Sequence, residues 1–223
     1  MNRVNHAKEL EKIIKHIAGS RESADAPLPR LLLHCCCAPC SSYCLMYLLP
    51  YFEITCFYYN PNITDEDEYK KRLAELKRLA GIINETEAER LCGRKIAVTD
   101  GAYDADIFLE KVKEQDLASC PEGGMRCHMC FTLRLSAAYD EAVRGGFDYF
   151  TTTLTISPHK DAQLINTIGY DIASKGAATC GSASPIWLPS DFKKNDGYKM
   201  SVVLSERFGL YRQNYCGCDF SRR

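Results

Sequence analysis

The segment from Leu31 to Ser41, Leu-Leu-Leu-His-Cys-Cys-Cys-Ala-Pro-Cys-Ser, constrains the fold more than any other part of the sequence. A short apolar run that ends at a breaker is typical of a buried strand rather than a helix. Pro39 suits the first position of a helix, where its missing N–H is not needed. We therefore expect Cys36 and Cys37 in the turn between a strand at 30–34 and a helix. Ligands bind at such turns in α/β sheets, and a helix N-terminus favours a thiolate.

The number of cysteines points to metal or redox chemistry. The 223 residues include 13 cysteines, an odd number in a chain too long for a small disulfide scaffold. Three groups stand out: Cys35, Cys36, Cys37 and Cys40; Cys120, Cys127 and Cys130; Cys216 and Cys218. We assign the isolated Cys44, Cys56, Cys92 and Cys180 to packing or to the surface.

Strands and helices alternate along the chain, which predicts an α/β fold: a Rossmann-like parallel sheet with helices on both faces. The expected strands are 30–34, 54–59, 96–98, 147–153 and 186–188. The expected helices are 5–18, 41–49, 65–80, 105–115, 127–143, one after Pro158, and 198–207. We expect a single domain over 1–223, with an α/β core at 30–190 and a C-terminal extension at 191–223.

The composition excludes several functional classes. A formal net charge of −1 gives no global attraction to nucleic acid, so any RNA contact has to be local. No apolar stretch is long enough to span a bilayer, and Met1 to Glu9 lacks the apolar core of a signal peptide. We expect a cytoplasmic protein without a membrane partner.

Cys127-His128-Met129-Cys130 is a C-x-x-C motif at the start of an expected helix, where a spacing of three places both sulfurs on one face. Together with Cys36 and Cys37 it supplies four thiolates at the C-terminal edge of the strands. Four cysteines suit zinc or an iron–sulfur cluster, and the sequence does not choose between them. Cys40 and Cys120 compete as ligands. The neighbouring His34 and His128 are candidates for metal binding or proton donation, or for hydrogen bonding around the ligands.

Cys216-Gly217-Cys218 is a different motif. A disulfide across two positions closes a very small ring, for which glycine gives the backbone freedom, and such a ring is easily reduced. This favours a redox pair over a structural disulfide. Two ordinary thiols, or a ligand of a second metal, are the alternatives.

Two further segments suggest a substrate site. The hydroxyls from Thr151 to Ser157 follow an expected strand and are candidates to line a pocket. Basic and aromatic residues interleave from Asp191 to Tyr198, a pattern that suits a phosphate backbone, although a solvated surface explains it equally well. The basic and aromatic residues of the tail extend this pattern: Arg207, Tyr211, Arg212, Arg222 and Arg223.

A set of motifs in order along the chain resembles epoxyqueuosine reductase of the QueH type. They are His34…Cys36-Cys37-Ala38-Pro39-Cys40, Tyr59-Asn60-Pro61-Asn62-Ile63, Cys127-x-x-Cys130, Phe147 to Pro158, Ser190-Asp191-Phe192-Lys193-Lys194 and Gly209 to Cys218. The resemblance runs from about Leu31 to Ser221 and leaves the N-terminal helix, 1–20, outside it. It implies an enzyme that reduces epoxyqueuosine to queuosine at the wobble position of tRNA, a two-electron removal of the epoxide oxygen in the last step of queuosine biosynthesis.

The resemblance also implies a cofactor and roles for six cysteines. A [4Fe-4S] cluster would be held by Cys36, Cys37, Cys127 and Cys130, with room for an additional iron or other metal ion. Cys216 and Cys218 would be the redox-active pair that forms a disulfide during turnover. The implied partners are the tRNAs for Asp, Asn, His and Tyr and an electron donor that the sequence does not identify.

Two departures from the family pattern concern cysteines. Cys35 stands where an apolar residue is usual, which makes the ligand register ambiguous by one residue. Cys120 stands where an acidic residue is expected. The alternatives to this enzyme are a zinc-stabilised RNA-binding protein and a general thiol-disulfide oxidoreductase.

Overall fold

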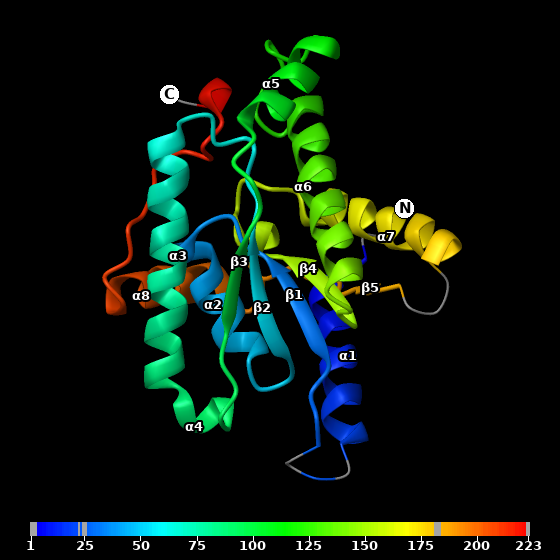
Figure 1. Cartoon of the computed structure of the whole chain (residues 1–223), viewed down its shortest axis with the longest axis vertical. Coiled ribbons are helices and arrows are strands. Elements are labelled where there is room, and N and C mark those ends of the chain that lie inside the picture. The colour runs from blue at the N-terminus through cyan, green and yellow to red at the C-terminus, as the bar shows by residue number, and fades with distance from the viewer. Residues whose placement is uncertain (1–3, 22, 24–25, 181–183, 222–223) are drawn as a thin grey trace.

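The computed structural model describes residues 4–21, 23, 26–180 and 184–221. In chain order the elements are α1 (His6–Ser20), β1 (Arg30–His34), α2 (Ala38–Leu48), β2 (Glu53–Tyr58), α3 (Glu66–Thr86), α4 (Ala88–Leu91), β3 (Ala97–Asp100), α5 (Ala105–Glu114), α6 (Met125–Arg144), β4 (Tyr149–Thr152), the 3-10 helix η1 (Thr153–Ile156), α7 (Ala162–Cys180), β5 (Ile186–Trp187), α8 (Gly197–Arg207) and the 3-10 helix η3 (Asp219–Ser221). Figure 1 shows the sheet between α3 on one side and α6 on the other. Within the described ranges, no helix is both long enough and apolar enough to cross a membrane.

The five strands in the described ranges are all parallel, as the sequence predicts, and their order is β3-β2-β1-β4-β5. The chain builds outward from β1 to β3 and then returns to add β4 and β5 on the other side of β1. The order therefore reverses between β1 and β4, and a ligand crevice opens at the carboxyl ends of these two strands. The backbone N–H of Cys36 donates to Thr153 Oγ1 across this point, at 3.2 Å. The cysteine turn thus lies at the switch point of the sheet.

The side chains of the three leucines of β1 pack on both faces of the sheet. Leu31 and Leu33 pack into the core cluster that α1, α2, α3 and α8 cover, and Leu32 packs into the cluster under α6 and α7. All three side chains are fully buried. Complete burial of a leucine stabilises a fold by roughly 1.5–3 kcal/mol, so this short strand anchors both layers.

Most element boundaries differ from the predicted ones by one to three residues, and two differ for a clear physical reason. Helix α3 continues to Thr86 rather than ending at residue 80, because the fully buried Ile83 extends its apolar stripe. Strand β4 ends at Thr152 because that side chain accepts a hydrogen bond from the N–H of Leu154 and starts η1.

Candidate metal and redox site

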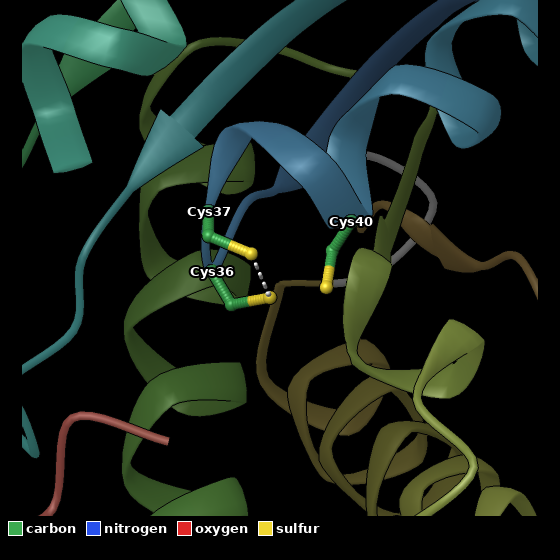
Figure 2. A group of neighbouring side chains, drawn as sticks. All are labelled: Cys36, Cys37 and Cys40. Atoms are coloured by element: carbon green, nitrogen blue, oxygen red, sulfur yellow. Dashed lines mark hydrogen bonds between the residues drawn. The ribbon is translucent and has the colours of Figure 1, made fainter. Parts of the chain in front are cut away.

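Cys36, Cys37 and Cys40 form a cluster at the start of α2. Their sulfur atoms all lie within 4.8 Å of one another, and Figure 2 shows the three side chains pointing toward a common centre. The Sγ atoms of Cys36 and Cys37 are 3.8 Å apart. Cys37 is the N-cap residue of α2 and has an extended backbone. Cys40 lies three residues later, on the first turn of the helix, which places its side chain next to that of Cys37. Three thiols at this separation can hold a metal ion.

Cys36 is the member of this cluster that ionises first. Hydrogen bonds from the thiols of Cys37 and Cys40 lower the pKa of Cys36 well below its ordinary value, and the positive charges of Lys160 and Arg134 add to the effect. The same coupling raises the pKa of Cys37 to about 12. The turn therefore presents one thiolate with two thiols around it.

The structure separates Cys35 from this cluster. Its side chain is fully buried in the core cluster under α2 and α3, and its thiol donates to the carbonyl of Leu33 at 3.3 Å. Of the three consecutive cysteines, Cys36 and Cys37 face the site and Cys35 belongs to the core. The isolated Cys44 and Cys56 are likewise fully buried, while Cys92 is exposed. The side chain of Cys180 lies outside the described part of the chain.

Cys127 and Cys130 lie in the first two turns of α6. The N–H of Gly123 donates to Cys127 Sγ at 3.2 Å, and Cys130 is buried. In the described part of the chain, only Cys36, Cys37 and Cys40 form a group with three ligand atoms as close as a single metal ion requires. The structure therefore groups Cys40 with Cys36 and Cys37, and it does not bring Cys127 and Cys130 into that same close group.

Two adjoining cavities connect these cysteines with the C-terminal tail. A cavity of about 710 Å³ is lined by Cys36, Cys37, Cys40 and Cys216. A smaller one of about 110 Å³ is lined by Cys127, Cys130, Cys216 and Cys218. The residues that line both are Glu122, His159, Lys160, Cys216 and Ser221. The six cysteines to which the family resemblance assigns roles thus all line one or both of these cavities, as does Cys40, whereas Cys120 lines neither.

Arg134 is a buried cation that sequence reasoning missed. It is 1% exposed, and it lines the larger cavity. Its guanidinium donates to Asn60 Oδ1 and to Cys130 Sγ, while its Nε is buried without a described partner. Burying a charge without a partner of opposite charge lowers the stability of the folded state. Its position therefore favours an anionic occupant beside Cys130. The signal was present in the sequence, because Cys127, Cys130 and Arg134 recur at helical spacing on one face of α6.

Two more cations line the larger cavity. Desolvation opposes the charge of Lys160, but electrostatic attraction to the sulfur atoms of Cys216 and Cys36 outweighs it and raises the pKa of Lys160. Arg72 is 2% exposed and lies on the buried stripe of α3 with Tyr69 and Leu76. A charged residue on an apolar helical stripe is a detectable signal, whereas nothing in the local pattern distinguishes Lys160.

His34 is held as a neutral ring rather than as a metal ligand. Its Nε2 donates to the carbonyl of Tyr59 at 3.1 Å, which leaves Nδ1 to accept from the hydroxyl of Thr152 at 2.7 Å. Burial, and the positive charge of Arg134, lower the pKa of His34 to about 3. Both ring nitrogens are used, so His34 ties β1 to β4 and to the end of β2.

The hydroxyls expected to line a pocket are mostly used inside the fold. Thr151 donates to the carbonyl of Leu188, and Thr155 bonds Ser190, whereas Ser157 lines the larger cavity. In the basic segment, Lys193 is half-buried and bonds the carbonyls of Thr155 and Lys160. The exposed cations of this region are Lys194, Lys199, Arg207 and Arg212. Arg222 and Arg223 lie outside the described residues.

Comparison with known proteins gives one consistent result. A family model described as "Epoxyqueuosine reductase QueH" matches residues 31–223. The chain is 36% identical over 219 residues to the epoxyqueuosine reductase QueH of Staphylococcus epidermidis, covering 98% of this chain and 85% of the relative. It is 37% identical to that of Streptococcus pyogenes serotype M1, over 99% of this chain and 79% of the relative. For Thermotoga maritima the identity is 31%, over 86% of this chain and 89% of the relative. The chain therefore belongs to the epoxyqueuosine reductase QueH family.

Proposed function

We propose that this chain reduces epoxyqueuosine to queuosine at the wobble position of tRNA. The observation that carries the proposal is the convergence of cysteines from three segments, after β1, in α6 and in the tail, around two adjoining cavities. The family match and the names of the relatives support the same reaction. The zinc-stabilised RNA-binding protein and the general thiol-disulfide oxidoreductase have no such support.

The thiols of the tail can supply the electrons and protons that the proposed reaction consumes. Removal of the epoxide oxygen breaks two carbon–oxygen bonds, forms a carbon–carbon double bond and releases water, which requires two electrons and two protons. Oxidation of Cys216 and Cys218 to a disulfide releases two electrons and two protons. Cys216 lines both cavities, so it is the thiol of the pair that reaches a substrate in the larger one. A reductant must then restore the dithiol.

The residues around the cavities fit the proposed iron–sulfur cofactor. Cys36, Cys37, Cys127 and Cys130 would hold a [4Fe-4S] cluster, whose four thiolates make it anionic. The buried guanidinium of Arg134 beside Cys130 and the ammonium of Lys160 supply the opposite charge. Cys40, beside Cys36 and Cys37, supports an additional iron or other metal ion. When bound, such a centre supplies single-electron transfer and a Lewis acid for an oxygen atom.

The surface of the larger cavity suits a tRNA anticodon. Tyr198 and Tyr215 line it and offer rings on which an unstacked base can stack, and the exposed Arg212 lies beside them. Lys194 and Lys199 are exposed nearby in sequence and suit phosphates. The proposed partners are the tRNAs for Asp, Asn, His and Tyr together with an electron donor. The many free cysteines support action in the reducing cytoplasm.

Anaerobic turnover tests this proposal. The chain, purified without oxygen and assayed for iron and sulfide, is incubated with epoxyqueuosine-containing tRNA and a chemical reductant, and the nucleosides are then analysed. We expect queuosine from the parent protein and none from Cys216→Ser or Cys218→Ser, although both variants keep their iron. A colourless zinc protein that binds tRNA without turnover would contradict the proposal.

A further inference from the structure

The C-terminal tail after α8 runs beside α3, as Figure 1 shows in orange and red against teal. Two arginine–glutamate pairs on α3 bond carbonyl groups of the tail. Arg78, paired with Glu75, donates to the carbonyls of Phe208 and Gly209 at 2.8–3.2 Å. These contacts fix the point at which the tail leaves α8.

The second pair holds the segment that carries the cysteines. Arg72, paired with Glu68 at 2.7 Å, donates to the carbonyl of Cys216 at 3.2 Å and to that of Tyr215 at 3.5 Å. The side chains of Arg72 and Glu68 are only 2% and 11% exposed, whereas that of Arg78 is 44% exposed. Charge-assisted hydrogen bonds away from solvent are the stronger ones. The pair nearer to the cysteines is therefore the more rigid anchor.

Two neighbours of Arg72 reinforce this anchor. Asn62 Nδ2 donates to the same carbonyl of Cys216, at 3.3 Å. Gly217 then turns the chain with a φ of +100°, and a Cβ there would lie 2.6 Å from Ile63 Cγ1. The result is an asymmetric pair of thiols: Cys216 lines both cavities, while Cys218 is 8% exposed and lines only the smaller one.

We propose that Arg72, supported by Glu68, is a positioning residue that holds Cys216 at the wall shared by the two cavities. Its guanidinium bonds the backbone carbonyl of Cys216 and leaves the sulfur free for chemistry. Loss of Arg72 leaves this carbonyl with the Asn62 amide as its one described donor, so that the thiol shifts from the shared wall while Cys36, Cys37 and the cysteines of α6 keep their places. This inference rests on the proposed role of Cys216 and Cys218 as the redox pair.

The test measures the thiols as well as turnover in the metal-loaded, reduced protein. Alkylation by iodoacetamide, followed by mass spectrometry, gives the rates at Cys216 and Cys218 in the parent, Arg72→Lys, Arg72→Gln and the control Arg78→Gln. We expect Arg72→Gln to change the ratio of the two rates at least fivefold and to lower kcat at least tenfold, with KM within threefold and iron content unchanged. Arg72→Lys keeps a charged hydrogen-bond donor, and we expect its alkylation ratio and its kcat to lie between those of the parent and of Arg72→Gln. Arg78→Gln keeps the parent ratio.

The outcomes separate this inference from the proposed function. Turnover by Cys216→Ser would remove the redox role and the positioning role together. If Cys216→Ser is inactive but Arg72→Gln keeps the parent alkylation ratio and kcat, only the positioning role is overturned. If Arg72→Gln does not fold, Arg72→Lys and Glu68→Gln decide: a ratio changed at least threefold in either supports the role, and parent values in both overturn it.

Discussion

Nη1 of Arg134 lies 3.9 Å from Sγ of Cys130, one helical turn earlier on α6. This places a buried positive charge beside a proposed ligand of the iron–sulfur cluster. Outer-shell partners of this kind typically contribute 10–100-fold to metal affinity. We therefore predict that Arg134→Gln loses iron to a chelator about 10–100-fold faster than the parent protein.

The matched control for Arg134 is Arg144 on the same helix, whose side chain is 78% exposed. Arg144→Gln should lose iron at the parent rate. Equal rates of iron loss in Arg134→Gln and Arg144→Gln would show that Arg134 does not support the metal centre.

Iron and sulfide analysis of single cysteine variants tests the ligand set. Metal binding is coupled to local folding, so Cys130→Ala should lose most iron and sulfide and loosen the start of α6. Cys44→Ala and Cys92→Ala, in the core and on the surface, should keep both. Full iron content in Cys130→Ala would remove it from the ligand set.

Cys40→Ala distinguishes a role in the cluster from a role beside it. If Cys40 serves only an additional metal ion, the variant keeps sulfide at the parent level and loses only part of the iron. Loss of sulfide together with iron would instead make Cys40 a cluster ligand and displace one of the four proposed residues.

Gly217 should be intolerant of a side chain for two reasons. Its φ is +100°, and an added Cβ would lie 2.6 Å from Ile63 Cγ1. Backbone strain of this kind costs about 1–3 kcal/mol, so Gly217→Ala should displace the cysteine segment and abolish most turnover. Gly209→Ala is the matched control, because its φ is also positive, at +56°, but no atom lies within 4 Å of the added Cβ. Urea unfolding and turnover measured on both variants check the difference, and equal effects would contradict it.

The buried His34 should make the fold sensitive to acid. Its pKa is lowered to about 3 in the folded state, below the ordinary value of 6.5, so the folded chain resists protonation that the unfolded chain accepts. The free energy of unfolding is therefore unaffected by the protonation of His34 well above pH 6.5. It decreases progressively as the pH falls from 6.5 toward 3. Between pH 7 and pH 5 the loss should be about 2 kcal/mol. Urea unfolding of the parent and of His34→Gln at both pH values, in identical preparations, should show the smaller loss in the variant. An equal loss in both would assign the acid sensitivity to other groups.

The sequence predicted the sheet, its longer helices and the cysteine turn, but not the short α4, because apolar runs and breakers are local signals. The sequence did not decide which of Cys35, Cys36 and Cys37 face the site, and the reason is also local. Whether Cys35 or Cys37 faces the site depends on how β1 ends, and the structure places Cys35 in the core. Arg72 and Arg134 were missed, although each stands on a buried helical stripe, because their roles depend on residues far away in the sequence. The contact of Arg72 with the Cys216 carbonyl spans 144 positions.

Counting thiols during a single turnover tests the central claim most directly. The protein is reduced, freed of reductant without oxygen, and mixed with an equimolar amount of epoxyqueuosine-containing tRNA. Queuosine is then quantified alongside the cysteines that still react with iodoacetamide. We expect up to one queuosine per chain, with a matching loss of reactive thiol at both Cys216 and Cys218. Queuosine formed while both cysteines remain fully reactive would contradict the account.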